Sequence, residues 1–263
     1  MRVGFVQFDC RFGEIENNAY RAAHFISHQR ADLWVLPELF NTGYQFVSKR
    51  EVAALAEPVP NGPTTQRLIR MAKENKTHLV AGLAERSGKS FYNSSVLVGP
   101  KGLIGLYRKI HLFYEETRWF TPGNLRFQVH PVGKARVGMM VCFDWFFPEA
   151  ARSLALLGAD LIAHPSNLVL PYCPDAMPTR CLENRLFAVT ANRVGSESRG
   201  TETLTYIGMS EVVDPKGKIL YRASDKNEEA HVVEIDPKLA RNKSLNRYND
   251  LIKDRRNRFY VKS

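Results

Sequence analysis

The sequence predicts an α/β protein in which two β-sheets pack together with helices outside them. Short apolar runs alternate with segments of helical spacing through the first and middle parts of the chain. Hairpin-like turns separate further strand-like runs, which indicates mixed sheets. So many strands suit two sheets covered by helices better than one sheet. Without an internal repeat, low-complexity segment or linker, the 263 residues predict a single domain, 1–263.

The first half of the chain contributes strands, two helices and several turns. Apolar alternation predicts strands and 3.6-residue spacing predicts helices. His24 and His28 have a spacing that suits a metal, but no third ligand is evident, so a solvated helix face is the better interpretation. The expected strands are 2–8, 32–39, 78–85, 91–99 and 103–110, and the expected helices are 17–28 and Thr64 or Thr65 to about 76.

The second half repeats this alternation and ends in a basic tail. A proline–lysine–glycine turn joins two of its strands, and residues 244–259 have an amphipathic pattern. The expected strands are 127–132, 136–141, 161–167, 187–194, 208–213, 219–221 and 231–235, and the expected helices are 149–157 and 176–186.

Cys142 lies where a predicted central strand ends. Pro148 suits the first position of the following helix, because a missing N–H costs nothing there. Open α/β sheets place their chemistry at such strand ends. A thiol near the positive end of a helix dipole is favoured as thiolate. The alternative is a small buried cysteine that only packs.

Two other ionisable residues, Glu38 and Lys109, also stand where apolar strands end. Each has an ordinary alternative, a solvated carboxylate or a surface ion pair. Together with Cys142 they match acyl transfer to sulfur. A thiol needs a base, and the developing oxyanion needs a fixed positive charge and a backbone N–H.

Four motifs occur in an order that resembles the carbon–nitrogen hydrolase, or nitrilase, superfamily, and especially its compact archaeal nitrilase-like amidases. They are Pro37-Glu38, the 107–112 segment around Lys109, Phe120-Thr-Pro-Gly123, and the 141–149 segment around Cys142. The resemblance covers nearly the whole chain. It implies a four-layer αββα sandwich that pairs with a second copy into an αββα–αββα homodimer.

The resemblance also implies roles for individual residues. Glu38 would be the general base, Lys109 the electrostatic stabiliser and Cys142 the nucleophile. A second glutamate that positions substrate is expected at Glu116, with the adjacent Glu115 as the alternative. The backbone N–H of Phe143 would share the charge of the oxyanion, and neither a metal nor an organic cofactor is implied.

Further polar and aromatic residues are candidates for the substrate pocket. Asn167 ends its strand as a polar wall residue or as a turn residue, and packing is the alternative for the aromatic candidates. Cys173 and Cys181 are interpreted as packing thiols. The aromatic candidates for the wall are Tyr44, Trp145 and Tyr172.

The leading functional prediction is a thiol hydrolase that converts a small carboxamide to carboxylic acid and ammonia. A nitrilase is disfavoured by the short chain and by Phe143-Asp144, where typical nitrilases carry Trp-Glu. An N-carbamoyl amidohydrolase would need a cation for a carboxylate, for which Arg180 or Arg193 could serve. A non-catalytic scaffold that binds an acidic partner through the tail is the alternative outside enzymes.

Composition bounds the remaining possibilities. Of the net charge of +10, the tail from 238 carries +7, so nucleic-acid binding by a basic face is disfavoured, and the tail is expected at the dimer interface. The four cysteines form no CxxC pair, which favours a reducing compartment. Without an apolar run long enough for a bilayer or a signal-peptide pattern, the sequence predicts a cytoplasmic protein without membrane partners.

Overall fold

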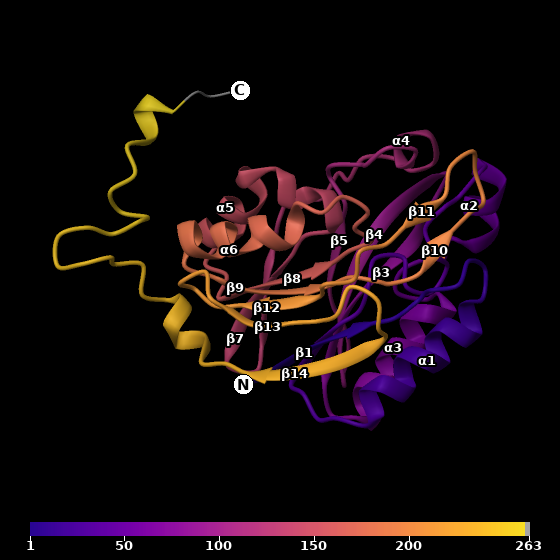
Figure 1. Cartoon of the computed structure of the whole chain (residues 1–263), viewed down its shortest axis with the longest axis horizontal. Coiled ribbons are helices and arrows are strands. Elements are labelled where there is room, and N and C mark those ends of the chain that lie inside the picture. The colour runs from indigo at the N-terminus through magenta and orange to yellow at the C-terminus, as the bar shows by residue number, and fades with distance from the viewer. Residues whose placement is uncertain (261–263) are drawn as a thin grey trace.

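Two six-stranded β-sheets packed face to face form the centre of the molecule, shown in Figure 1 as a computed structural model that describes residues 1–260. In each sheet three central strands run parallel and the outer strands pair antiparallel. The first sheet has the order β14 (Glu229–Glu234), β1 (Arg2–Gln7), β2 (Leu33–Val35), β3 (His78–Ser87), β4 (Ser90–Gly99), β5 (Gly102–Arg108). The second has the order β13 (Ile219–Arg222), β12 (Glu211–Val213), β9 (Phe187–Ala191), β8 (Leu161–Pro165), β7 (Ala135–Met139), β6 (Val129–Val132).

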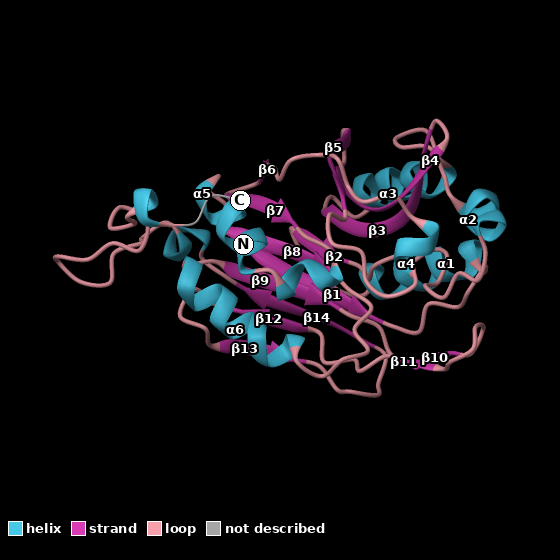
Figure 2. Cartoon of the chain, turned by 90° about the horizontal axis from the view of Figure 1, so that it is seen from above, coloured by secondary structure: helices cyan, strands magenta, loops and turns pink. Residues whose placement is uncertain are grey.

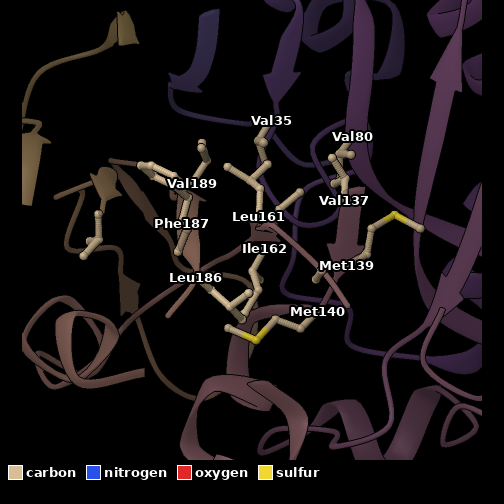
Figure 3. Close-up of a cluster of buried hydrophobic side chains, with 14 of the residues drawn as sticks. Val35, Val80, Val137, Met139, Met140, Leu161, Ile162, Leu186, Phe187 and Val189 are labelled. Carbon is tan, nitrogen blue, oxygen red and sulfur yellow. The ribbon is translucent and has the colours of Figure 1, made fainter. Parts of the chain in front are cut away.

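The core lies between the two sheets, where apolar side chains from facing strands meet (Figure 3). Val35 and Val80 come from the first sheet, and Val137, Leu161 and Val189 from the second. All five are fully buried. The central strands are apolar throughout because a sheet that is covered on both faces must bury both sets of side chains.

Helices cover the outer faces of both sheets and complete four layers (Figures 1 and 2). α1 (Ile15–Ser27) and α3 (Pro63–Glu74) pack on the first sheet through residues such as Ile26 and Leu68. α5 (Pro148–Leu156) and α6 (Cys173–Asn184) pack on the second. The order helix, sheet, sheet, helix confirms the αββα sandwich that the sequence predicts.

Several elements differ from their predicted form. The strand expected at 32–39 ends at Val35, which leaves Glu38 in a loop. A short helix that the sequence did not predict, α2 (Lys49–Leu55), begins at Ser48, whose Oγ accepts from Glu51 N–H, while the Glu51 carboxylate accepts from Val47 N–H. The other small elements are α4 (Glu116–Trp119), the hairpin β10 (Ser196–Glu197) and β11 (Leu204–Thr205), and the 3-10 turns η1 (Cys142–Phe146), η2 (Pro237–Ala240) and η3 (Asn257–Phe259).

The basic tail leaves the sandwich and extends away from it (Figure 1). Arg241 still pairs with Asp160, and Lys243 Nζ donates to the carbonyls of Asn184 and Arg185. Beyond them, the tail as far as residue 260 has turns and η3 but no α-helix. Among the helices of residues 1–260, none is long and apolar enough to cross a membrane.

Candidate active site

Glu38, Lys109 and Cys142 follow the carboxyl ends of β2, β5 and β7, and the fold brings the three together. β5 runs in the same direction as β3, because two antiparallel pairings separate them. The carboxyl ends of β2, β3 and β5 therefore lie along one edge of the first sheet. The last residue of β7 in the second sheet, Met139, contacts the first sheet through Ser95 Oγ of β4, at 3.6 Å from its sulfur.

The loop that carries Glu38 is held against β3 at Gly82. Phe40 N–H donates to the Gly82 carbonyl, and Gly82 N–H donates to the Pro37 carbonyl. A Cβ at Gly82 would lie 2.5 Å from Glu38 Cα, so only glycine permits this approach. Leu39 adopts φ +49°, a left-handed conformation that turns the chain directly after the carboxylate.

Lys109 lies between two carboxylates in the interior. Its Nζ donates to Glu38 Oε1 and to Glu116 Oε1, each at 2.7 Å, and its side chain is fully buried. Asn93 Nδ2 donates to Glu38 Oε1 at 2.7 Å and to Glu116 Oε2 at 3.3 Å. Glu38 Oε2 has no partner among residues 1–260. One oxygen of the Glu38 carboxylate therefore remains available for proton transfer.

Glu116, not Glu115, is the second carboxylate at Lys109. Glu115 points outward and pairs with Arg118 at 2.8 Å. Tyr44 Oη donates to Glu116 Oε1 at 2.6 Å, the same oxygen that accepts from Lys109 Nζ. The sequence predicts Tyr44 as an aromatic wall residue of the substrate pocket. In the structure its hydroxyl contacts Glu116 instead, and Tyr44 does not line the pocket beside Cys142.

Cys142 adopts φ +43° at the start of η1, a conformation that non-glycine residues rarely take. The surrounding turn is fixed by Asp144, whose Oδ2 accepts from Val141 N–H at 2.8 Å and from Tyr107 Oη at 2.7 Å. Asp144 Oδ1 accepts from His111 at 2.7 Å. This network determines where the sulfur points.

His164 holds the carbonyl of Cys142 from the second sheet. Its Nε2 lies 2.9 Å from Cys142 O, and because a carbonyl only accepts, Nε2 must carry the hydrogen. Nδ1 lies 3.1 Å from Thr190 Oγ1. Burial lowers the pKa of His164 to about 4, so the ring is neutral at neutral pH and keeps this arrangement.

Burial dominates the protonation of the reactive groups. It raises the pKa of Cys142 well above its ordinary value, and the charge of Glu38 raises that pKa further. The helix α5 begins at Pro148 as predicted, but its dipole does not favour the thiolate in the free protein, because burial and the charge of Glu38 outweigh it. Burial would lower the pKa of Lys109, but the carboxylates of Glu116 and Glu38 together raise it. Burial also raises the pKa of Glu116, to about 7.

A small, mostly apolar pocket with a cavity volume of about 20 Å³ opens beside Cys142. The predicted residues Phe143, Trp145 and Asn167 line it. Tyr172 does not line it and is 59% exposed at the start of α6. The remaining lining residues are Phe113, Leu168, Val169 and Leu170.

Neither arginine considered as a carboxylate-binding residue is free. Arg180 pairs with Glu183 at 3.1 Å, and its Nε donates to the Trp145 carbonyl. Arg193 is buried between Asp9 and Glu197, with 2.6 Å to each. Neither residue lines the pocket beside Cys142.

Three residues of the site were missed in the sequence: Asn93, Asp144 and His164. His164 is a polar residue inside an otherwise apolar strand, which was the available signal, whereas Asn93 begins a polar run with Ser94 and Ser95 that does not single it out. Their partners lie far along the chain, so spacing could not identify them. Among residues 1–260, no group of three or more His, Cys, Asp or Glu side chains could hold a metal ion.

Comparison with known proteins gives one consistent family. A model of the carbon-nitrogen hydrolase family matches residues 2–243. A protein of Pyrococcus abyssi named nitrilase is 51% identical over 100% of both chains. An (R)-stereoselective amidase of Pseudomonas sp. is 39% identical, covering 97% of this chain and 92% of that protein. The structure of a Nesterenkonia sp. AN1 amidase variant, with acrylamide added at its active-site cysteine, has a TM-score of 0.81 at 27% identity, covering 98% and 97%.

Proposed function

The chain belongs to the carbon–nitrogen hydrolase family, and from this premise we propose that it is a cysteine-dependent amidase for a small, neutral carboxamide. It is a hydrolase of C–N bonds other than peptide bonds. The observation that carries the proposal is Lys109 Nζ at 2.7 Å from both Glu38 and Glu116, buried beside Cys142. Such a complete set of contacts disfavours the alternative of a non-catalytic scaffold.

The proposed reaction begins with the transfer of the Cys142 proton to Glu38 Oε2, the carboxylate oxygen without a partner among residues 1–260. A raised thiol pKa suits this step, because the base must take the proton as sulfur attacks the carbonyl carbon. Lys109 Nζ and the Phe143 N–H, for which residues 1–260 provide no backbone acceptor, would stabilise the oxyanion.

The tetrahedral intermediate then collapses. Glu38 returns its proton to the departing nitrogen, the C–N bond breaks, ammonia leaves, and a thioester remains on Cys142. Water loses a proton to Glu38 and attacks the thioester carbonyl. The C–S bond breaks, the acid is released, and the proton returns to sulfur. Every proton passes through Glu38, while Lys109 stays charged between its carboxylates.

The pocket supports a neutral acyl group over a carbamoyl acid. Six of its eight lining residues are apolar, and the pocket has little free space. A substrate carboxylate in this pocket would lose its water without gaining a cation as partner. This desolvation makes the binding free energy less favourable by roughly several kcal/mol. Arg180 and Arg193, the cations considered from the sequence, pair with other residues.

Nitrile hydrolysis by the same site is the second candidate, because the Pyrococcus abyssi relative is named nitrilase. That relative matches this chain over the full length of both, so a short chain does not argue against nitrile hydrolysis. Sulfur would attack the nitrile carbon, with the negative charge developing on nitrogen. The two candidates share Cys142 and differ in substrate.

Ammonia release from a panel of aliphatic amides, ω-amides, N-carbamoyl acids and dinitriles tests the proposal. We expect the highest rate with a small neutral amide and no ammonia from the variant Cys142→Ala. The matched control is Cys181→Ala, which removes a buried thiol on α6 that does not line the pocket. Ammonia release by Cys142→Ala at the wild-type rate would refute the nucleophile assignment.

We also propose that two copies pair through α5, α6 and the tail. Leu156, Leu157 and Leu182 on and beside these helices are 44%, 51% and 49% exposed, and the tail extends from the same end of the sandwich (Figure 1). Exposed apolar groups favour association. Light scattering should give twice the chain mass of 29.9 kDa, and a mass of one chain would contradict the pairing.

A further inference from the structure

One buried polar atom in the pocket, Asn167 Oδ1, has no hydrogen-bond partner among residues 1–260. Asn167 is 2% exposed and lines the pocket that contains Cys142. Its Nδ2 donates to the Glu38 carbonyl at 2.8 Å. Because a carbonyl oxygen cannot donate, this bond fixes which end of the amide group is nitrogen. The oxygen Oδ1 must therefore take the other side.

The neighbouring Asn192 shows how this region satisfies a buried amide when no ligand is needed. Asn192 Oδ1 accepts from Leu168 N–H at 2.8 Å, and its Nδ2 donates to the Gly208 carbonyl at 2.6 Å. Both ends of that side chain are paired. An unpaired buried acceptor costs free energy, and proteins keep few of them. Asn167 is the pocket-lining residue with such a side-chain atom in the described part of the chain.

The position of Asn167 relates it to the reacting atoms. Asn167 lines the pocket together with Cys142, its backbone partly offsets the rise in the pKa of that thiol, and its side chain contacts the Glu38 backbone. Asn167 thus lies between the nucleophile and the base. In the proposed mechanism this is the side on which the nitrogen leaves, since Glu38 supplies the proton to that nitrogen.

We propose that Asn167 Oδ1 accepts an N–H of the substrate carboxamide, so that the site selects substrates whose leaving nitrogen carries hydrogen. This inference rests on the proposed amidase function and deepens it. A primary amide offers two N–H donors, whereas a nitrile or an ester of the same acyl group offers none. The substrate class is therefore small, neutral primary carboxamides.

Among the described residues that line the pocket, Asn167 alone has an unpaired side-chain oxygen. The other unpaired oxygen of the site, Glu38 Oε2, takes the thiol proton in the proposed mechanism. Phe113, Phe143, Leu168, Val169 and Leu170 have no polar side-chain atom. The backbone oxygen of Leu168 already accepts from Ile207 N–H. A substrate N–H that enters this pocket gives up its hydrogen bond to water and can donate to Asn167 Oδ1 instead. A substrate without N–H leaves that oxygen unpaired, which is how polar sites reject analogues that lack a hydrogen-bonding group.

The test compares three substrates with one acyl group, propionamide, methyl propionate and propionitrile, in the wild type and in Asn167→Leu. Leucine has a similar size and removes both polar atoms. We expect kcat/KM for the amide to fall at least about tenfold more than kcat/KM for the ester. Equal losses on amide and ester would overturn the inference, because a residue that only supports Glu38 affects both reactions alike.

Two further results keep the inference separate from the proposed function and from misfolding. Binding of propionamide and methyl propionate to Cys142→Ala, where no turnover is expected, should favour the amide by about tenfold. Equal affinities would overturn the role of Asn167 even if Asn167→Leu does not fold. If the wild type hydrolyses none of the three substrates, the proposed function fails, while the binding comparison still decides the inference.

Discussion

The molecule contains two clusters of the same charge pattern, each with one buried cation between two carboxylates. Lys109 lies between Glu38 and Glu116, and Arg193 lies between Asp9 and Glu197. Both cations are fully buried. Composition alone would assign the two clusters the same role.

They differ in how completely their acceptors are paired. The Glu197 carboxylate accepts from Arg193, from the Tyr206 hydroxyl and from the N–H groups of Tyr44 and Gln45. The Arg193 guanidinium also lies 4.1 Å from the centre of the Tyr206 ring. In the other cluster, Glu38 Oε2 has no partner within residues 1–260, and the Cys142 thiol is nearby. A fully paired cluster holds structure, whereas a free oxygen beside a thiol permits chemistry.

Tyr44 connects the two clusters. Its N–H donates to Glu197 and its hydroxyl donates to Glu116. The Arg193 cluster therefore holds Tyr44 in place, and Tyr44 in turn holds Glu116. We predict that substitutions in the Lys109 cluster change the rate of the reaction, and that substitutions in the Arg193 cluster change stability.

The largest expected effect is that of Glu38→Gln, which keeps the shape of the side chain but removes the proposed base. Ammonia release should fall on the order of 10³-fold, while thermal unfolding changes little. Steady-state rates and a melting curve check this. A variant that keeps more than a tenth of the wild-type rate would show that another group takes the thiol proton.

Arg193→Met should act on stability. It leaves Glu197 and Asp9 without their buried cation, and the free energy of unfolding should fall by about 3–5 kcal/mol. The rate per folded molecule should stay within a few-fold of wild type. The control Arg67→Met removes an exposed pair with Glu16 and should cost about 1 kcal/mol or less. Urea denaturation measures both, and similar costs for the two variants would remove the distinction between the clusters.

The buried His164 should make part of the free energy of unfolding depend on pH. Its pKa in the folded state is about 4, below the ordinary 6.5, because burial disfavours the charged ring. Between these values the unfolded chain binds a proton that the folded protein does not, so the stabilisation is complete above pH 6.5 and is lost as pH falls toward 4. The full effect is about 3 kcal/mol.

Denaturation at pH 7 and pH 4.5 should therefore show a smaller pH dependence for His164→Gln than for the wild type. Glutamine keeps an N–H for the Cys142 carbonyl. All other titratable groups are the same in both proteins, so their contributions to the pH dependence cancel in the comparison. The same pH dependence in both would contradict a neutral, buried His164.

Tyr44→Phe should give the smallest effect, a three- to tenfold decrease in kcat/KM, because one hydrogen bond contributes about 1 kcal/mol. The Tyr44 hydroxyl lowers the pKa of Glu116, which burial raises to about 7. Without the hydroxyl, Glu116 takes up its proton at higher pH, and the acid limb of the rate profile should move upward. An acid limb at the same pH in Tyr44→Phe and in the wild type would show that Tyr44 does not affect the ionisation of Glu116.

The fold and the three central residues could be predicted from the sequence because their signals are local. Short apolar runs that end in Glu38, Lys109 or Cys142 mark strand ends, and the ordered motifs add specificity. The strand expected at 32–39 ends early because its last residues bond to β3 as a loop around Gly82. A loop of apolar residues has the same pattern as a buried strand.

The pairing of buried polar groups could not be predicted, because it joins residues far apart in the chain. Asn93 lies 55 residues from Glu38, and Arg193 lies 184 residues from Asp9. Arg193 was considered as a substrate-binding cation because its partners were invisible in the sequence. The lowered pKa of His164 likewise depends on burial in the finished fold.

The central claim is that substrate becomes bonded to Cys142 through a thioester. Rapid acid quenching during turnover of a small amide, followed by peptide mass spectrometry, tests it most directly. The peptide that contains Cys142 should gain the mass of the acyl group, and Cys142→Ala should show no such gain. Turnover without any adduct on Cys142, or an adduct on another residue with the same kinetics, would contradict the account.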